Sequence, residues 1–258
     1  MDIEAFFAHE GVDVSSRVGI EDLTDADRAS VREFLPAARS VVVFGREVPA
    51  PVYRMPEREK TREMLRIAAS LDETASRLAG CLDAEHIPAR VVPLYFPVRV
   101  VDEKVQGIVR LKQIAAAAGL GDIGKNTLLL HRRFGPRLLL AGVVTGEPAS
   151  GKTAAAAPVC TGCGACIRAC PAGALGPAGV DAFRCRNVRA WVPPPVVPAA
   201  KWLLRRQFLL RSAAPLAPLV ARAATIRCSR CVTECPAFLG AAEKGCDMDP
   251  VKSPPDPR

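Results

Sequence analysis

The N-terminal part of the chain alternates between short apolar runs and segments with helical periodicity. Residues 41–44 (Val-Val-Val-Phe) form a continuous run of β-formers that ends at Gly45, which predicts a buried strand. Residues 89–95 and 137–145 predict two further strands. Pro93 lacks the N–H that a central strand needs, so the first of these is expected at a sheet edge or at a bulge.

Helical patterns occupy the intervals between these runs. Residues 2–10 predict a short helix, and Thr24 resembles the first residue of a capping box that opens a second one. Over residues 57–85 apolar side chains recur at helical spacing, and Cys81 is expected to be a small buried side chain near that face. Strands that alternate with helices over residues 1–150 predict an α/β or α+β domain.

The sequence pattern changes after a linker of small residues at 146–158. Regular periodicity largely disappears, and thirteen of the 23 prolines lie from Pro171 onward, which is typical of loops held by bound metal rather than by long helices or strands. We therefore expect a second domain over residues 151–258. Within it, we expect a basic insert at about 186–227 and a disordered tail at about 249–258.

A cysteine motif opens this second domain. Cys160, Cys163, Cys166 and Cys170 are spaced C-x2-C-x2-C-x3-C and followed by Pro171, which is the spacing of bacterial ferredoxins. Three thiolates in one short turn reach three corners of one cubane cluster, while the fourth serves another cluster when two are present. Zinc sites use two separated pairs of ligands instead. The spacing favours an iron–sulfur cluster over structural zinc or disulfides.

A second motif, C-x2-C-x3-C-P, is formed by Cys228, Cys231 and Cys235 and lacks one leading cysteine. Cys185 can supply the missing ligand; Cys246 is its rival, and a free thiol is the favoured interpretation of Cys246. Crossing the last cysteine of each motif predicts two [4Fe–4S] clusters with four ligands each. The first would be held by Cys160, Cys163, Cys166 and Cys235, and the second by Cys170, Cys185, Cys228 and Cys231.

The composition indicates the cellular compartment in which the protein is expected. Hydrophobic residues make up 49% of the chain and charged residues 24%, which is ordinary for a soluble globular protein. The first residues are acidic and lack the basic start of a secretory signal, and no apolar run is long enough to span a bilayer. Ten cysteines without an export signal are typical of a reducing compartment, so a cytoplasmic protein without a membrane span is expected.

Charge is concentrated in one segment. The net charge is +8, yet residues 182–233 contain ten Lys and Arg and no Asp or Glu. Three interpretations stay open: neutralisation of an anionic cluster, docking of an acidic electron donor such as flavodoxin or ferredoxin, and contact with an RNA backbone. The first two are favoured jointly, because the segment has no stacking aromatics arranged as in a known RNA-binding module.

Two glycine motifs are weak signals. Residues 146–153 satisfy the phosphate-loop pattern G-x4-G-K-T, but too few residues follow before Pro158 to form the helix that faces the phosphates. Residues 119–124 (GLGDIG) match G-x-G-x-x-G, but the preceding segment is helical, whereas a dinucleotide fingerprint follows a strand. These contexts argue against binding of a nucleotide triphosphate, NAD or FAD.

The order of these motifs resembles the epoxyqueuosine reductase family. The shared features are GLG-x-x-GKNTLL, then FG, a strand, CxxCxxCxxxCP, D-x-x-x-C and CxxCxxxCP, and the resemblance covers about residues 30–240. It implies an α+β fold: an α/β corrinoid-binding-like domain with a nitroreductase-like sheet, related to reductive dehalogenases, joined to a bacterial-ferredoxin-like double [4Fe–4S] domain. Electrons would pass from an external donor through the clusters to cobalamin for a reductive reaction.

The resemblance also implies site residues. Residues expected on the corrinoid side are Gly119, Gly121, Gly124, Lys125 and Asn126, although helix capping and a solvated charge would also explain the last two.

Two departures from the family stand beside these matches. The family's acidic proton donor falls at Val105, where Asp102 or Glu103 would substitute only with a register shift. The chain also stops before the helical-repeat domain that helps the family hold tRNA. The leading hypothesis is a corrinoid-using iron–sulfur oxidoreductase. A ferredoxin-type electron-transfer protein without substrate chemistry is the alternative, and a tRNA-modifying enzyme proper is a third hypothesis.

Overall fold

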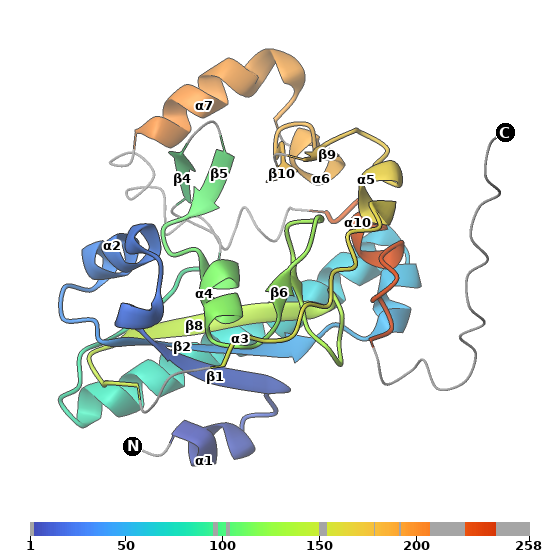
Figure 1. Cartoon of the computed structure of the whole chain (residues 1–258). Helices are drawn as coiled ribbons and strands as arrows, with labels where there is room; N and C mark the ends of the chain where they lie inside the picture. The colour runs from blue at the N-terminus through green and yellow to red at the C-terminus, as the bar shows by residue number, and fades with distance from the viewer. Residues whose placement is uncertain are drawn as a thin grey trace, which may run out of the picture.

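A four-stranded sheet forms the centre of the first 150 residues. The computed structural model describes residues 3–94, 98–101, 104–149, 154–177, 179–190, 192–206 and 225–240 (Figure 1). The strand order is β1 (Val14–Gly19), β2 (Ser40–Glu47), β8 (Leu138–Thr145) and β3 (Ala89–Val91). Every pairing in this sheet is antiparallel, so the class is α+β, and the parallel arrangement of an α/β fold does not describe it.

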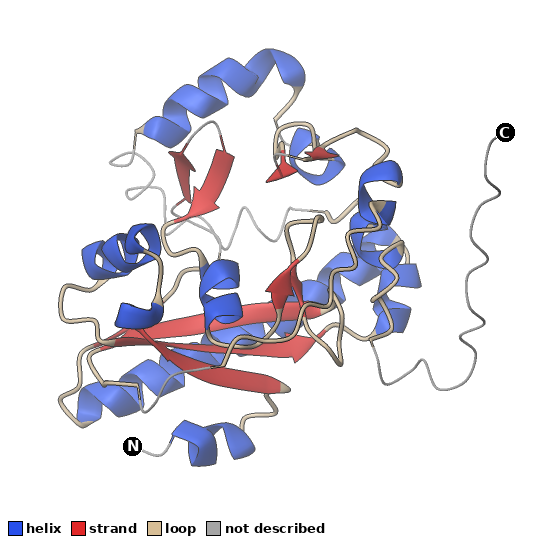
Figure 2. Cartoon of the chain, in the orientation of Figure 1, coloured by secondary structure: helices blue, strands red, loops and turns tan. Residues whose placement is uncertain are grey.

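Helices cover both faces of the sheet (Figure 2). Because successive side chains of a strand point to opposite faces, Val41 and Val43 of β2 pack in one core and Val42 and Phe44 in the other. The first core includes residues of α2 (Asp25–Phe34) and α4 (Leu111–Ala117), and the second includes residues of α1 (Ile3–Ala8) and α3 (Glu57–Ala84). All four of these β2 side chains are buried, as the continuous apolar run predicts.

The long helix α3 confirms the helical periodicity of residues 57–85. Its side chains Leu71, Leu78 and Leu82 are fully buried against the sheet. The expectation of a buried Cys81 is wrong, because that side chain is exposed. Each residue turns a helix by about 100°, so the position next to Leu82 is rotated out of the apolar stripe.

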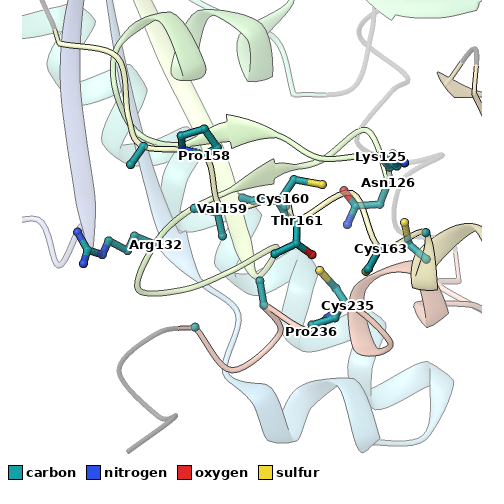
Figure 3. A pocket seen from close by; sticks show the side chains of 16 residues that line it. Lys125, Asn126, Arg132, Pro158, Val159, Cys160, Thr161, Cys163, Cys235 and Pro236 are labelled. Carbon is teal, nitrogen blue, oxygen red and sulfur yellow. The ribbon is translucent and has the colours of Figure 1, made fainter. Parts of the chain in front are cut away.

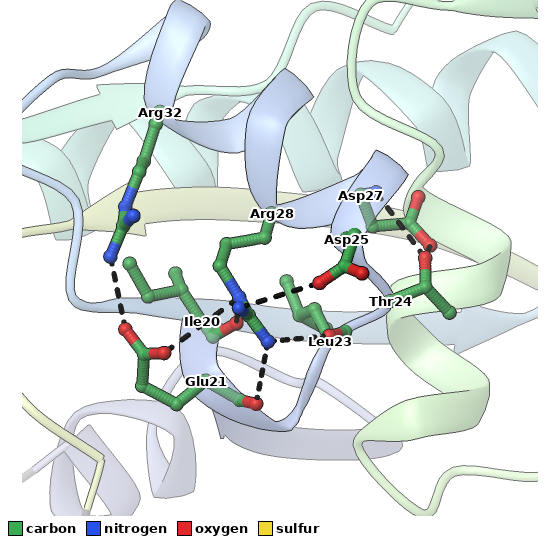
Figure 4. Close-up of polar contacts among 8 residues, drawn as sticks. All are labelled: Ile20, Glu21, Leu23, Thr24, Asp25, Asp27, Arg28 and Arg32. Atoms are coloured by element: carbon green, nitrogen blue, oxygen red, sulfur yellow. Dashed lines mark hydrogen bonds and ion pairs between the residues drawn. The ribbon is translucent and has the colours of Figure 1, made fainter.

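The start of α2 confirms the predicted cap (Figure 4). Thr24 Oγ1 accepts a hydrogen bond from the Asp27 backbone N–H at 3.3 Å and donates to Asp27 Oδ2 at 2.7 Å. Arg110, which precedes α4, pairs with the same carboxylate at 2.7 Å. In the same region, Arg28 donates to the carbonyl oxygens of Ile20 and of other residues of the preceding turn. The cap therefore fixes α2 against its neighbours as well as satisfying its first turn.

Replacing Thr24 by alanine is expected to lower the free energy of unfolding by about 1 kcal/mol, because an N–H at the start of α2 loses its acceptor. Urea unfolding measures this change. Thr24→Ser keeps the hydroxyl and is expected to retain most of the stability. Equal losses in the two variants would show that the hydroxyl group does not cap the helix.

The elements outside the sheet are short. They are η1 (Ile20–Asp22), η2 (Ala50–Arg54), β4 (Val98–Val101), β5 (Lys104–Gly107), β6 (Asp122–Ile123), β7 (Leu129–Leu130), α5 (Ala165–Arg168), β9 (Leu175–Gly176), β10 (Gly179–Val180), α6 (Arg186–Arg189), η3 (Pro194–Val196), α7 (Val197–Arg205) and α10 (Arg230–Thr233). After β8, the longest described element is the nine-residue α7, which packs against β4. This pattern agrees with the predicted scarcity of regular structure in the second half of the chain.

Several expectations fall outside the described residues. They concern residues 207–224 of the basic insert, the disordered tail at 249–258 and the phosphate-loop residues 151–153. None of the described helices combines the length and the apolar character that crossing a bilayer requires.

Candidate functional site

Four cysteines from distant parts of the chain border one cavity of about 420 Å³ (Figure 3). Cys160, Cys163 and Cys166 lie before and within α5, whereas Cys235 follows α10. The two short helices pack against each other, which brings Cys235 to the other three. All three of them also influence its ionisation electrostatically. This set is the one predicted for the first cluster.

The local backbone prepares this first set for thiolate chemistry. Gly162 and Gly164 adopt left-handed φ angles of 73° and 71°, which a side chain would strain and which turn the loop tightly. The backbone N–H of Ala165 lowers the pKa of the exposed Cys163 thiol. Burial raises the pKa of the Cys166 thiol. A bound cation would offset the desolvation of such a thiolate.

The other four predicted ligands also gather in one place. Burial raises the pKa of Cys231 to about 11, and the electrostatic effects of Cys228, Cys185 and Cys170 follow in that order. These three neighbours belong to three separate segments of the chain. The eight cysteines therefore divide into two groups of four, with Cys170 in the group of the other motif.

Cys170 receives several backbone donors. Burial opposes ionisation of its thiol, but the N–H groups of Ala172, Ala174, Leu175 and Gly173 outweigh burial and lower its pKa. The Ala174 nitrogen lies 3.3 Å from Cys170 Sγ. Hydrogen bonds to sulfur of this kind stabilise the ligands of iron–sulfur clusters. The donor set around Cys170 therefore fits such a group.

Asn187 connects Cys185 to the second motif. Its Nδ2 donates to the Cys228 carbonyl oxygen at 2.9 Å, and its Oδ1 accepts from the Cys228 N–H at 2.8 Å. Because Cys185 is the N-cap residue of α6 and Asn187 lies two positions later, this pair of bonds holds Cys185 beside Cys228. Sequence reasoning missed Asn187. Cys246, the rival ligand, lies outside the described residues.

The cysteine groups differ from a site for a single metal ion. Among the described residues, no three His, Cys, Asp or Glu side chains converge as they would around a single metal ion. The first group instead stands around the cavity, and the second has N–H donors directed at a sulfur. Both groups suit a polynuclear cluster that is larger than one ion and rich in sulfur.

The GLGDIGKN block holds the cysteine loops. Asp122 accepts hydrogen bonds from the backbone N–H groups of Val159 at 2.9 Å and Cys160 at 3.2 Å. Lys125 Nζ donates to the Gly162 carbonyl oxygen at 2.8 Å. The block therefore contacts the first motif through two of its charged side chains, on either side of Cys160.

The same block also reaches the second motif. Asn126, which is only 4% exposed, donates from Nδ2 to the Cys231 carbonyl oxygen at 3.1 Å. Its Oδ1 accepts from the Leu128 N–H at 3.2 Å and so shapes the turn between β6 and β7. Lys125 and Asn126 are consecutive residues, and each one contacts a different cysteine motif.

The glycines of this block serve close packing. A side chain at Gly121 would place its Cβ 2.2 Å from the Leu130 carbonyl oxygen, and one at Gly124 would lie 2.7 Å from Asn126 Oδ1. Gly119 has a left-handed φ of 75° directly after α4. The close approaches found at Gly121 and Gly124 are thus to the β6–β7 hairpin itself, and a corrinoid contact by these residues stays a prediction.

Comparison with known proteins finds similar sequences. No family model matches the chain. The epoxyqueuosine reductase of Pseudomonas aeruginosa is 40% identical over 103 residues, which are 40% of this chain and 27% of that protein. The Synechocystis enzyme is 28% identical over 172 residues, or 63% of this chain and 55% of the relative. The chain thus spans about half, or less, of these curated relatives. The chain is related to the epoxyqueuosine reductases.

Solved structures of these reductases share the fold. The enzyme from Streptococcus thermophilus aligns over 99% of this chain and 68% of its own, with a TM-score of 0.58 and 17% identity. The Bacillus subtilis enzyme aligns over 92% of this chain and 65% of its own, with a TM-score of 0.57 and 20% identity. A catabolic reductive dehalogenase aligns over 67% of this chain and 25% of its own, with a TM-score of 0.51 and 17% identity. The expected relationship to both groups is confirmed at the level of fold.

The position at which epoxyqueuosine reductases are expected to place their acid lies on a hairpin. Val105 belongs to β5 and pairs with Val100 of β4, and its side chain is half-buried. Valine offers no proton at this position. Asp102 and Glu103 lie outside the described residues.

Replacing Asp122 by alanine is expected to speed the loss of iron from the first cysteine set about tenfold, because two N–H groups beside Cys160 lose a charged acceptor. Iron release to a chelator, followed under anaerobic conditions, measures the rate. Asp122→Asn keeps one acceptor oxygen and is expected to give an intermediate rate. Release at the unchanged rate in Asp122→Ala would mean that the carboxylate does not support the loop.

Proposed function

We propose that the chain is an iron–sulfur oxidoreductase in which two [4Fe–4S] clusters carry electrons to the N-terminal domain for a reductive reaction. The observation that carries this proposal is the division of eight cysteines into two groups of four, drawn crosswise from two motifs. Crossed ligands are the pattern of two-cluster bacterial ferredoxins, so residues 151–258 would form a ferredoxin-like domain. When bound, the clusters would supply one-electron transfer between a donor and the N-terminal domain.

The surroundings of the two groups suggest a direction for the electrons. Cys163 of the first group is exposed, which favours it as the side that meets a donor. Cys231 of the second group lies against the N-terminal domain, where it influences the ionisation of Tyr53 and Lys112. Lys125 and Asn126 contact one motif each and would keep the two clusters at a fixed separation. Electrons would therefore enter at the first cluster and leave through the second.

Cobalamin enters this proposal through the relationship to epoxyqueuosine reductases. The residues expected on the corrinoid side contact the cysteine loops and the β6–β7 hairpin instead, and Val105 has no proton to donate. These contacts favour a role for the block in holding the clusters. The valine specifically favours the second candidate function, an electron-transfer protein that reduces a partner protein or the partner's corrinoid.

One titration separates the two candidates. The protein is reconstituted anaerobically with iron and sulfide, and cob(II)alamin is added while the electron paramagnetic resonance (EPR) and visible spectra are recorded. A corrinoid-using oxidoreductase is expected to change the cob(II)alamin spectrum at one equivalent. Two intact clusters with an unchanged cobalamin spectrum would contradict corrinoid binding and leave the electron carrier.

The acid-free segment supports a proposal for the donor. Exposed cations in its described part are Arg184, Arg186, Arg189, Arg206, Arg227 and Arg230. We propose that they receive an acidic donor such as flavodoxin or ferredoxin. The rate of reduction by that donor should therefore fall as salt is raised from 0.05 to 0.5 M, because the Debye length shortens roughly threefold over this range. Stopped-flow absorbance measures the rate.

A related reductase structure includes an epoxyqueuosine-modified tRNA stem loop. Competition between a tRNA and the donor for this protein would assign the basic segment to RNA binding instead.

A further inference from the structure

Two lysines of the N-terminal domain lie beside the second cysteine group. Lys60 on α3 is only 6% exposed, and its Nζ lies 3.3 Å from the hydroxyl of Ser229, inside the second motif. Lys112 on α4 is half-buried and donates to the Thr127 carbonyl oxygen at 2.7 Å. It is also an electrostatic neighbour of Cys231. Two ammonium groups from two helices therefore face one cysteine loop.

Neither lysine has a carboxylate partner among the described residues. A buried ammonium group is strongly destabilising unless an anion lies next to it. Elsewhere this fold pairs the buried Arg137 with Glu47, and it pairs the partly exposed Arg110 with the buried Asp27. The hydroxyl and the carbonyl oxygen that Lys60 and Lys112 reach carry no charge. The two ammonium groups therefore call for an anion that the described side chains around them do not supply.

The surroundings of the two lysines would strengthen electrostatic interactions there. Thr61, next to Lys60, accepts a hydrogen bond from the Ile226 N–H at 2.8 Å and holds the start of the second motif against α3. Tyr53 lies close enough for Cys231 to raise its pKa, although burial is the larger cause. Water is displaced on this side of the motif, and charges interact more strongly where water is displaced.

We propose that Lys60 and Lys112 are positioning residues that raise the reduction potential of the second cluster. This inference rests on the proposed function. Four thiolates give a cubane a net negative charge, and the cluster gains one more negative charge when it accepts an electron. Burial disfavours that added charge, whereas nearby ammonium groups stabilise it. The two lysines would thus let the second cluster accept an electron from the first.

The test is an EPR-monitored redox titration of the protein loaded with both clusters. Cys185→Ala assigns the signals, because the signal missing from it belongs to the second cluster. Lys60→Met and Lys112→Met should each lower the ratio of reduced to oxidised second cluster about tenfold at a fixed potential, which is a shift of about 59 mV for one electron. The first cluster should shift by less. Lys60→Arg and Lys112→Arg keep the charge and should restore the ratio.

Arg62→Gln is the matched control, since this exposed residue of α3 loses the same charge into water. It should leave both potentials unchanged. An unchanged second cluster in both methionine variants, or equal shifts of both clusters, would overturn the proposal. A result in which Lys60→Met binds one cluster only while Lys60→Arg binds two would also show that the second cluster depends on the positive charge of residue 60. Loss of a cluster in both Lys60 variants would overturn the proposal. A wild-type protein without two clusters would instead refute the proposed function.

Discussion

Cys185→Ala is expected to remove one of the two clusters, so that bound iron falls from about eight to about four atoms per chain. Three remaining thiolates would leave one corner of the second cluster without a protein ligand. Cys185 lies in the electrostatic surroundings of Cys231 and is held beside Cys228 by Asn187, so no neighbouring cysteine among the described residues stands in its place. Iron analysis of the anaerobically reconstituted protein measures the loss, and EPR of the reduced protein shows which signal disappears.

Two other cysteines serve as controls for this experiment. Cys81 is exposed on α3, and Cys81→Ala should leave the iron content unchanged. Cys246→Ala should also retain about eight iron atoms, because that residue is expected to be a free thiol. The reverse result, with four iron atoms in Cys246→Ala and eight in Cys185→Ala, would reassign the eighth ligand.

Replacing Arg137 by methionine is expected to lower the free energy of unfolding by about 3 kcal/mol. Arg137 is only 2% exposed, pairs with Glu47 and donates from Nε to the Phe238 carbonyl oxygen at 2.5 Å. Its guanidinium also lies 5.4 Å from the centre of the Phe238 ring. Methionine fills similar volume but leaves a carboxylate and a carbonyl oxygen without their partner. Glu47 is partly exposed, which places the expected loss at the low end for a broken buried pair.

Urea unfolding of the loaded protein measures this loss. Arg66→Met breaks an ion pair with Glu63 on the surface of α3, where water screens the charges, and is expected to leave stability almost unchanged. Because Phe238 follows Cys235 by three residues, Arg137→Met should also loosen the first cluster, which Arg66→Met should not. Equal stability losses in the two variants would contradict a structural role for the buried pair.

Elements with strong local signals were predictable. The apolar run of β2, the periodicity of α3 and the Thr24 cap each depend on neighbours in sequence, and the structure confirms them. The strand β1 went unpredicted, because Ser15, Ser16 and Arg17 give it no apolar alternation. As an edge strand it needs only β2 as a partner, and that partner lies more than twenty residues away. Cys81 was misjudged because small residues tolerate both sides of a helix stripe.

The two cysteine groups could be proposed from their spacing, because the ligands of a cubane sit close together in sequence, and their role as cluster ligands stays a prediction. The residues that support these groups could not be predicted from the sequence. Lys60 and Ser229 are 169 residues apart, and Asp122 and Cys160 are 38 apart, so no local pattern connects them. The only signal that the sequence gives for such contacts is a polar residue at a position where the helical pattern calls for an apolar one. Lys60, within the apolar stripe of α3, is an example.

The most direct test of this account is the amount of iron and acid-labile sulfide in the anaerobically prepared protein, with EPR of its reduced form. We expect about eight iron and eight sulfide per chain and two interacting [4Fe–4S] signals. Zinc in place of iron, or about four iron per chain with all eight cysteines present, would contradict a protein built around two clusters.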